Sequence, residues 1–497
     1  NVNPITRLDY PDLDVIRVED TYYMVSTTMH FMPGCEILQS FDLVHWEHVT
    51  YVYETLDHTD AQQLKSGQNI YGQGMWAASL RYHEGRFCIC FVANDTRKTY
   101  LYTSEKIDGP WKKQLIEGFY HDGSLLFDED GRNYIVYGND EIWITELNED
   151  LTAPKKDGLH RLLVSDHKNP ELGYEGSHIQ KINGYYYIFL IHSLRDRWMR
   201  TEACFYSDSL EGEFTGGDVL CDDRGYCGQG VAQGGIVDTP DGKWYAMLFQ
   251  DSGAVGRIPI LLPVTWKDHF PFFGQNGHVP EEIEVHSTRP GYIYQPLVGS
   301  DDFCNGLLPR WQFNHDPDPR YYHLDALQGT YTITTREVCT ELTQAVNTLT
   351  QRMSYPSCAA EVTVDASALK EGDVAGLCAL QSCYAAVGIT KHHGKYEVLM
   401  LDKKEDGILD MTEGTVVESH QMDFRLEADF CNMKDEARCY YRVNKGDWLP
   451  IGTVHKLYFK LDHFTGCRFG LFCYAAEETG GSACFRDFKY YDVDEIS

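Results

Sequence analysis

The sequence predicts an all-β protein in which a five-bladed β-propeller is followed by a β-sandwich. Three observations lead to this prediction. Tight turns recur between aromatic and β-branched runs through the first 270 residues, at intervals of 46 to 65 residues. Alternating apolar and polar residues with polar turns continue beyond residue 300. Between the two regions, residues 283–300 carry two prolines and lack the hairpin pattern, which is typical of a connector.

Each repeat in the first region is a two-residue turn followed by a strand. The copies are Glu19-Asp20 before TYYMVST, Glu84-Gly85 before RFCICFV, Asp130-Gly131 before RNYIVYG, Asn183-Gly184 before YYYIFLI and Asp241-Gly242 before KWYAMLF. Asn-Gly and Asp-Gly between apolar runs favour β-hairpins, because both central residues of such turns adopt positive φ. Hairpins at this spacing are typical of four-stranded propeller blades. Five copies therefore predict five blades, with a β-sandwich of coincidental hairpins as the alternative.

The second region is predicted to be a separate β-domain. GTYTITT, AAEVTVDA and EARCYYRV each alternate apolar and polar residues and are separated by polar turns. Short strands of this kind in series indicate a β-sandwich. The predicted domains are therefore a propeller over residues 1–290 and a sandwich over residues 300–497.

The charge of the chain excludes several classes of partner. The 497 residues carry a formal net charge of −32, from 43 Lys and Arg against 75 Asp and Glu. Nucleic-acid binding requires basic groups that displace counterions from phosphates, and an acidic surface also repels anionic membranes. We therefore expect no nucleic-acid partner and no membrane partner. Aromatic residues make up 13 % of the chain, which suits β-packing or stacking on sugar rings.

The cysteines and the first residues bear on the compartment. No run of 18 apolar residues occurs, and NVNPITRLDYPDLD has neither the charged nor the apolar region of a signal peptide. The sixteen cysteines include no C-x-x-C pair, and a chain this large does not need a disulfide framework. We expect free thiols and a cytoplasmic location, although a cleaved signal would leave no trace. The sequence leaves a monomer and a homo-oligomer open.

The repeats also align one position in each blade. Counting back eight residues from one turn residue of each copy gives Asp12, Trp76, Asp122, Glu175 and Gln233. The first strand of each propeller blade lines the central channel, so we expect these equivalent positions to converge on one axis. Three of the five are carboxylic acids.

Three acids around one axis indicate a functional site. Like charges in a cleft repel one another and burial further penalises ionisation, so the fold gains no stability from them. Their separated pKa values suit acid–base chemistry, and glycoside hydrolysis requires a proton donor and a second carboxylate beside the bond that breaks. A structural calcium ion held by oxygen ligands is the alternative.

Motifs along nearly the whole chain resemble those of one known family. NPITRLDYPDLDVIRVEDTYYMVSTT with PGCEILQSFDLVHW is similar to the opening of glycoside hydrolase family 43. MWAASLRYHEGRF, HDGSLLFDEDGRNYIVYG and YEGSHIQKINGYYYIFL resemble its next three blade openings, in order. DDFCNGLLPRWQFNHDPD, EGDVAGLCALQ and FTGCRFGLFCYAAEETGG resemble the C-terminal β-sandwich of its β-xylosidase and α-L-arabinofuranosidase branch.

The resemblance implies a five-bladed propeller and hydrolysis with inversion by a single displacement. It implies that Asp12 is the general base, that Glu175 is the general acid, and that Asp122 tunes and positions the acid. The acid and base carboxyl groups should then lie roughly 6.5–9.5 Å apart, which leaves room for a water molecule.

The resemblance also implies substrate contacts. Trp76 and Ala77 in MWAAS match a sugar-contacting segment of the family, and Arg257 in GAVGRIPIL matches an arginine that binds substrate hydroxyls. HFMPG (30–34) matches a loop at the terminal-sugar pocket, which implies that Phe31 forms a hydrophobic wall. In this branch the sandwich closes one end of the pocket, which favours exo-action on short chains.

Whether a metal ion is expected depends on one position at which this sequence differs from the family. A histidine associated with a central calcium ion or water cluster often lies beneath the active site, whereas VAQGGIVDTPDG places Gln233 there. A neutral amide is a weaker guide to a metal. We therefore expect no required cofactor and no metal ligand among the site residues, with structural calcium as the alternative.

The expected function is that of an inverting exo-glycosidase acting on a xylo-oligosaccharide or an arabinoxylan-derived substrate. It would release terminal β-D-xylose, α-L-arabinofuranose or both, because the two sugars present similar ring atoms and hydroxyls. Three alternatives stay open. The first is a non-catalytic sugar-binding propeller, the second is a scaffold organised by calcium, and the third is a retaining five-bladed enzyme of the fructosidase type.

Overall fold

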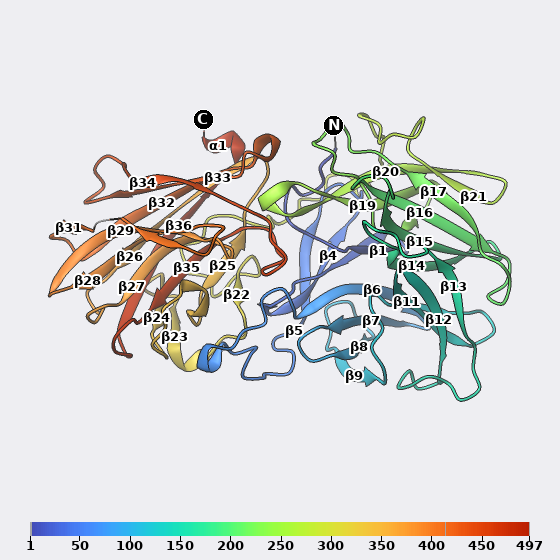
Figure 1. Ribbon diagram of the computed structural model, residues 1–497, viewed down its shortest axis with the longest axis horizontal. Helices are drawn as coiled ribbons and strands as arrows, with labels where there is room; N and C mark the ends of the chain where they lie inside the picture. The colour runs from blue at the N-terminus through green and yellow to red at the C-terminus, as the bar shows by residue number, and fades with distance from the viewer. Residues whose placement is uncertain (1, 413, 497) are drawn as a thin grey trace.

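The computed structural model describes residues 2–412 and 414–496, which form two β-domains side by side (Figure 1). Within this part of the chain the single α-helix, α1 (Val493–Ile496), occupies one turn near the C-terminus. The predicted architecture of a five-bladed propeller and a second β-domain is confirmed. Among the described residues, no helix is long and apolar enough to span a lipid bilayer. The 3-10 turns are η1 (Lys65–Gly67), η2 (Gly253–Val255), η3 (Pro319–Tyr321), η4 (Leu342–Gln344) and η5 (Cys431–Met433).

Five four-stranded antiparallel sheets form the propeller, on the right in Figure 1. The first blade contains β1 (Asp14–Val18), β2 (Thr21–Ser26), β4 (Gly34–Ser40) and β5 (Glu47–Tyr53). The second contains β6 (Met75–His83), β7 (Arg86–Ala93), β8 (Lys98–Ser104) and β9 (Lys112–Ile116). The third contains β10 (Ser124–Phe127), β11 (Asn133–Asn139), β12 (Glu141–Leu147) and β13 (His160–Ser165).

The last two blades close the ring. The fourth contains β14 (Glu175–Ile182), β15 (Tyr185–Ser193), β16 (Arg200–Ser207) and β17 (Thr215–Leu220). The fifth contains β18 (Ile236–Asp238), β19 (Trp244–Asp251), β20 (Arg257–Lys267) and β21 (Phe270–Phe273). First strands of neighbouring blades contact one another in the first four blades, and β18 of the last blade contacts β1 of the first. The Gln180 side chain of β14 joins the fourth blade to the fifth by two hydrogen bonds with the main chain of Ile236 in β18. These five strands therefore surround the propeller axis.

The predicted turns join the first and second strand of every blade. Strand β1 pairs with β2 from Val18 opposite Thr21, which leaves Glu19 and Asp20 as the turn. Glu84 and Asn183 occupy the equivalent turns with φ of 51° and 50°. Side chains are strained at positive φ, which is why Asn, Asp and Gly are frequent at these positions. The two-residue turns therefore mark the position of the first hairpin in each of the five blades.

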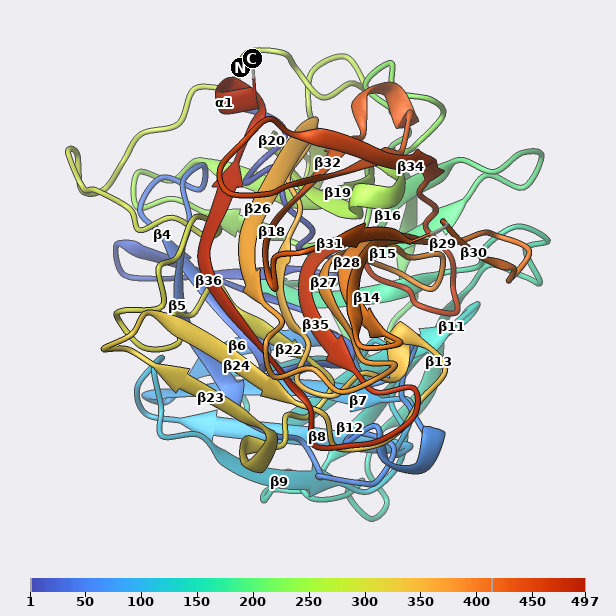
Figure 2. The ribbon, with the colours of Figure 1, turned by 90° about the vertical axis from the view of Figure 1, so that its left-hand side faces the viewer.

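The second domain packs two antiparallel sheets face to face, and Figure 2 views it end on. One sheet contains, in order, β3 (Phe31–Met32), β22 (Gln312–Asn314), β25 (Leu349–Arg352), β35 (Arg468–Tyr474), β27 (Val374–Leu380), β28 (Ala385–His392), β29 (Lys395–Lys403) and β30 (Leu409–Met411), with β31 (Thr415–Val417) also on β29. The other contains β23 (Tyr322–Asp325), β24 (Thr330–Thr334), β36 (Ser482–Tyr491), β26 (Ser357–Asp365), β32 (Gln421–Asp429), β33 (Glu436–Arg442) and β34 (Leu449–Lys456). Alternating apolar residues of both sheets form one buried core between them.

The two domains share a sheet and a core. Strand β3 leaves the first blade and pairs with β22 at the edge of the sandwich. Ala254 and Val255 of η2 in the propeller belong to the buried core of the sandwich. The buried Arg352 of β25 forms an ion pair of 3.0 Å with Glu36 of β4. The sequence pattern, which assigns one fold to each side of a connector, did not predict this interlocking.

All sixteen cysteines are free, as predicted. Cys88 and Cys90 lie two residues apart on β7, and both are buried. Burial raises the pKa of the Cys90 thiol to about 12 and that of Cys88 to about 11. These cysteines therefore act as small apolar groups in the core.

Candidate active site

The five aligned positions come together at one mouth of the propeller. Asp12, Trp76, Asp122, Glu175 and Gln233 all line a single cavity, and each comes from a different blade. Every one of them lies at or just before the beginning of an innermost strand. The repeat thus places one functional side chain per blade at the same end of the axis.

Local backbone distortions aim these side chains into the cavity. Asp12, Asp122 and Gln233 have φ of 54°, 48° and 69°, a left-handed conformation that is uncommon for residues with a side chain. Strand β14 begins with a register shift after Glu175, as β6 does around Trp76. Such bulges bend the strand and re-aim the residue beside them. Strained backbone of this kind is concentrated at functional sites.

Gly176 in the β14 bulge is required by close packing. Its φ is 63°, and a Cβ atom there would lie 2.7 Å from the Cγ atom of Gln233. Its main-chain N–H donates to Asp122 Oδ2 at 2.9 Å. The glycine therefore lets the fourth blade approach the third and fifth blades, with Glu175 directly before it.

Asp12 is held by two donors on one of its oxygens. Gln233 Nε2 donates to Asp12 Oδ1 at 2.9 Å, and Arg257 Nη1 donates to the same atom at 3.2 Å. Burial raises the pKa of Asp12 to about 6, Arg257 opposes the shift, and the charges of Asp122 and Glu175 add to it. An aspartate with this pKa is ionised at neutral pH and is more basic than an exposed one.

His121, which the sequence analysis did not single out, lies between the other two acids. Its Nε2 is 3.2 Å from Asp122 Oδ2 and 3.2 Å from Glu175 Oε2. Burial would raise the pKa of Asp122, but the adjacent His121 and the Gly176 N–H lower it below its ordinary value. Asp122 is therefore an ionised group with fixed partners, and Glu175 is the more exposed of the two acids.

Two arginines stand on the Asp12 side of the cavity. Arg257, at the beginning of β20, is buried, and its Nε lies 3.4 Å from Asp251 Oδ1. Arg200, at the beginning of β16, forms an ion pair with the other oxygen of Asp251 and also lines the cavity. Asp251 thus holds both guanidinium groups in place. Arg200 was not predicted, because it lies on a third strand outside the aligned positions.

The sandwich contributes one wall of the cavity. Phe464, from the loop that precedes β35, lines the cavity together with Trp76 and Ala77 of β6. Its ring lies 5.5 Å from the Trp76 ring, and the Arg257 guanidinium lies 4.7 Å from its centre. Gly466 N–H donates to Asp9 Oδ2 at 2.9 Å, which fixes this loop to the propeller. The cavity therefore belongs to both domains.

The structure places Phe31 in the domain interface and not in the cavity lining. Phe31 is fully buried, and its main chain forms part of β3 in the shared sheet. The Arg468 guanidinium lies 3.5 Å from the centre of its ring. The side chain is enclosed by the domain interface and is not among the residues that line the cavity. The HFMPG segment thus lies at the domain interface, and Phe464 is the phenylalanine that lines the cavity.

The residues around Gln233 do not fit a calcium ion. Calcium takes six to eight oxygen ligands. The Gln233 amide directs its NH₂ group at Asp12, and a donor there opposes a cation. In the described chain, three metal-ligating side chains with ligand atoms within 4.8 Å of one another occur once, at His121, Asp122 and Glu175. That set has an imidazole nitrogen and only two acids, which differs from the six to eight oxygen ligands that calcium takes.

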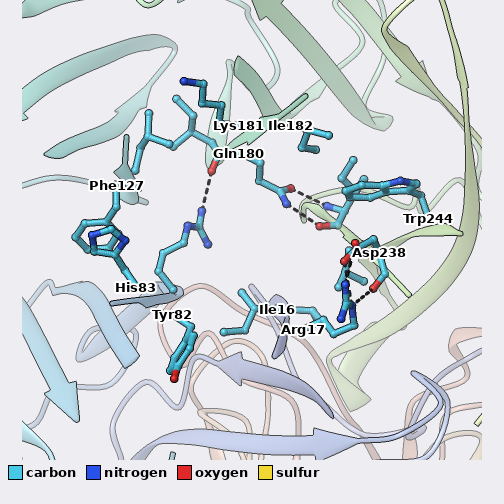
Figure 3. Close-up of a pocket in the computed structure, with 16 residues that line it drawn as sticks. Ile16, Arg17, Tyr82, His83, Phe127, Gln180, Lys181, Ile182, Asp238 and Trp244 are labelled. Atoms are coloured by element: carbon cyan, nitrogen blue, oxygen red, sulfur yellow. Dashed lines mark hydrogen bonds and ion pairs between the residues drawn. The ribbon is translucent and has the colours of Figure 1, made fainter. Parts of the chain in front are cut away.

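A second cavity lies at the other mouth of the axis (Figure 3). It is lined by later residues of the innermost strands, together with Trp244 of β19. Its cations Arg17, Arg81 and Lys181 are each paired with a carboxylate. Asp238 is the only carboxylic acid among the described residues that line it, whereas three acids line the cavity at the first mouth, which is therefore the candidate active site.

The comparisons with known proteins agree with this geometry. Residues 2–271 match the model of glycosyl hydrolases family 43, and residues 300–491 match that of the β-xylosidase C-terminal concanavalin A-like domain. A β-xylosidase of Formosa agariphila is 26 % identical over 99 % of this chain and 89 % of its own. A xylosidase/arabinosidase of Butyrivibrio fibrisolvens is 23 % identical over 99 % of both chains.

A solved structure is also similar over the full chain. A protein described as a bifunctional GH43-CE of Bacteroides eggerthii is 42 % identical, with a TM-score of 0.93. The match covers 100 % of this chain and 64 % of that one, so this chain spans less than two thirds of that protein's length. With a family model over more than half of its residues and the acids in place, this chain belongs to glycosyl hydrolases family 43 and is a glycoside hydrolase.

Proposed function

We propose that this chain is an inverting, exo-acting hydrolase that releases terminal β-D-xylose, α-L-arabinofuranose or both from xylan-derived oligosaccharides. The observation that carries the proposal is the convergence of Asp12, Asp122 and Glu175 on one cavity. The names of the relatives, β-xylosidase and xylosidase/arabinosidase, support a terminal pentose. A sugar-binding propeller without activity is not favoured, because it would need no such set of acids.

In the proposed reaction, Asp12 and Glu175 act on opposite faces of the sugar. Asp12 accepts a proton from a water molecule, and the water oxygen attacks the anomeric carbon. The bond from that carbon to the glycosidic oxygen breaks, and Glu175 donates its proton to the departing oxygen. Gln233 and Arg257 both donate to Asp12 Oδ1, so we assign Oδ2 to the water.

Asp122 acts in this proposal as a positioning residue. Its Oδ2 accepts the Gly176 N–H and contacts His121, so it ties the beginning of β14 to the third blade. Glu175 is the first residue of that strand. The position of the proton donor relative to the sugar therefore depends on Asp122, and small displacements of a donor are costly for catalysis.

The wall supplied by the sandwich supports exo-action. Phe464 and Trp76 pack against each other across the domain boundary and line the same cavity. Side chains of both domains close one end of the cavity. Such a cavity receives the end of a sugar chain more readily than its middle. Aromatic faces of this kind also bury the apolar faces of sugar rings.

Phe464→Ala is expected to raise KM for an aryl pentoside about tenfold, with a smaller change in kcat. The substitution removes apolar surface from the sugar pocket and leaves the acids in place, and burial of such a side chain contributes roughly 1.5–3 kcal/mol. Initial rates over a range of substrate concentrations measure both constants. Phe272→Ala, at a ring that is 50 % exposed on β21, is the matched control and should leave both constants unchanged. A parent-like KM in Phe464→Ala would remove this residue from the pocket.

Time-resolved NMR of the first sugar product tests the proposed function. The enzyme should hydrolyse 4-nitrophenyl β-D-xyloside, 4-nitrophenyl α-L-arabinofuranoside or both, and the sugar should first appear with inverted anomeric configuration. Short xylo-oligosaccharides should lose single pentose units from the non-reducing end. First appearance of the retained anomer would contradict inversion. Binding of xylo-oligosaccharides with no hydrolysis of any pentoside would favour the non-catalytic alternative.

Chelation is expected to leave hydrolysis unchanged. We propose that the protein side chains carry the reaction without a required metal, because the Gln233 amide occupies the space beside Asp12 with a donor. Initial rates and the thermal midpoint should agree within error before and after dialysis against EDTA. Loss of activity that calcium restores, with magnesium as the comparison, would contradict this proposal.

A further inference from the structure

A buried acid lies behind the active-site cavity and has no part in the reaction as proposed. Glu202, on β16 of the fourth blade, is fully buried and does not line the cavity. It lies between Ile191 of β15 and Leu220 of β17, which are both buried in apolar cores. Within the described chain it forms no ion pair. A carboxyl group buried without a cation is costly, so packing alone does not explain an acid at this position.

The carboxyl group of Glu202 has one hydrogen-bond partner in the described chain, the main chain of Gln233. The Gln233 N–H donates to Glu202 Oε1 at 2.9 Å, whereas Oε2 has no partner among the described residues. Burial raises the pKa of Glu202 well above its ordinary value, and the Gln233 N–H opposes this shift. Glu202 is therefore a neutral carboxylic acid at neutral pH, and its Oε1 atom serves as a hydrogen-bond acceptor.

Gln233 depends on this acceptor because the strands of its own blade do not hold its N–H group. Ala232, the residue before it, forms two main-chain hydrogen bonds with Phe249 of β19, and strand pairing with β19 resumes at Ile236. Between these points Gln233 has φ of 69°. A left-handed conformation of this kind persists in a residue with a side chain only where the surroundings impose it. The hydrogen bond to Glu202 is one such constraint.

The side chain of Gln233 transmits this fixed main-chain geometry to Asp12. Its Nε2 donates to Asp12 Oδ1 at 2.9 Å, and both side chains are buried. Gly176 leaves the space that the Gln233 side chain occupies, since a Cβ atom at Gly176 would lie 2.7 Å from the Gln233 Cγ atom. A rotation of the Gln233 main chain would therefore move the amide away from Asp12 or into β14.

We propose that Glu202 is a positioning residue that fixes the main chain of Gln233 from the core behind the cavity and thereby holds Asp12 in the orientation that activates water. The inference rests on the proposed function, since Asp12 is the base of that reaction. Glu202 lies outside the cavity lining, so it acts through the hydrogen bond from Gln233 and the second bond from Gln233 to Asp12. A displacement of about 1 Å caused by a distant substitution can lower a rate about 10²-fold, so an indirect contact of this kind is sufficient.

Replacement of Glu202 by side chains with and without an acceptor tests this inference. Glu202→Gln keeps the carbonyl oxygen and the length of the side chain, so kcat and KM on 4-nitrophenyl pentosides should stay within about twofold of the parent. Glu202→Met keeps the length but lacks the carbonyl oxygen, and its kcat should fall about tenfold or more. The KM of Glu202→Met should change by less than about twofold, because the groups that contact the sugar stay in place. A merely structural role would not confine the loss to kcat and to the variant without the acceptor.

A double-mutant cycle shows whether Glu202 acts through Gln233. Gln233→Ala removes the amide beside Asp12 and should by itself lower kcat about as much as Glu202→Met does. Glu202→Met added to Gln233→Ala should lower kcat by less than about twofold further, because residues in one hydrogen-bond network are not additive. Equal further losses in the two backgrounds would overturn the role of Glu202.

Glu146→Met is the matched control. Glu146 is buried on β12, its Oε1 accepts the N–H of Leu159 at 3.2 Å, and it does not line the cavity, so kcat should stay unchanged. Thermal melts show which variants fold, and Glu202→Leu is a second variant without an acceptor. If the parent hydrolyses no pentoside, the proposed function fails and the role of Glu202 fails with it. If the parent is active but Glu202→Met keeps its kcat, or if Glu202→Gln folds and neither apolar variant does, the role of Glu202 alone is overturned.

Discussion

Glu175→Gln is expected to lower kcat by about 10²–10⁴-fold on a xylo-oligosaccharide, because an amide cannot give a proton to the departing oxygen. With a dinitrophenyl pentoside, whose phenolate leaves without protonation, kcat should stay close to that of the parent. The dependence on the leaving group therefore identifies the step in which Glu175 acts. Gln has the same size as Glu, so the bulge at the beginning of β14 is expected to be retained. Initial rates on the two substrates at one pH give the comparison.

Glu129→Gln is the matched control for this result. Glu129 is 83 % exposed in the hairpin turn of the third blade, and its replacement should change neither rate. Equal losses on both substrates in Glu175→Gln would contradict the role of proton donor. Such a result would indicate that the variant disturbs binding or the position of another acid, which a change in KM or in the thermal midpoint would reveal.

Asp12→Asn is expected to lower kcat by about 10³-fold or more and at the same time to stabilise the fold at neutral pH. The activity falls on every substrate, since a good leaving group does not replace the base that activates water. The stability rises because burial holds the pKa of Asp12 at about 6, above its ordinary value of 3.8. A group with a raised pKa contributes full stability below its unfolded pKa and loses that contribution as the pH rises through its folded pKa.

At pH 7 the ionised Asp12 therefore weakens the fold by up to about 3 kcal/mol, and the neutral amide removes this cost. The thermal midpoint of Asp12→Asn should exceed that of the parent by a few degrees at pH 7, and the difference should shrink at pH 4.5, where the parent aspartate is protonated. Asp196→Asn, at an exposed carboxylate, should change neither activity nor midpoint. A lower midpoint at pH 7 would contradict the electrostatic argument.

The propeller could be predicted from the sequence because the residues that mark each blade are close to one another along the chain. Each blade needs a turn with positive φ between two apolar runs, and the residues that tolerate this conformation are few. Glu84-Gly85 and Asn183-Gly184 therefore mark blades as clearly as the strands do. The sandwich was predictable only as a class, because alternation reveals strands but not the order in which they pair.

The acids were predictable for a related reason. Because the blades repeat one structural unit, residues at the same distance in sequence from each hairpin turn occupy the same place in each blade. Counting eight residues back from the turn therefore gives Asp12, Asp122 and Glu175, which lie at one end of the propeller axis. The roles assigned to them came from a family resemblance and stay predictions until the variants are measured. The offset also gave Gln233, whose amide contacts Asp12.

The remaining site residues carry no such signal. Phe464 reaches the cavity from a loop of the other domain, and no pattern in its own sequence indicates which surface that loop meets. His121 was within reach, since it directly precedes an aligned acid, but alternation along a strand would direct it away from Asp122. The positive φ of Asp122 cancels that alternation and brings both side chains to one cavity. The burial of Phe31 in the shared sheet has no local signal either, because its partner strand lies about 280 residues further along the chain.

Recombination at the linker would not separate this chain into two viable halves, because strand β3 of the first blade completes a sheet whose other strands come from the sandwich. A fragment ending near residue 271 would carry β3 with its neighbour missing, and the complementary fragment would expose the edge of β22. Unpaired strand edges are templates for aggregation. We therefore expect the two domains to be inherited and exchanged as one module, with substitutions in either domain constrained by the other.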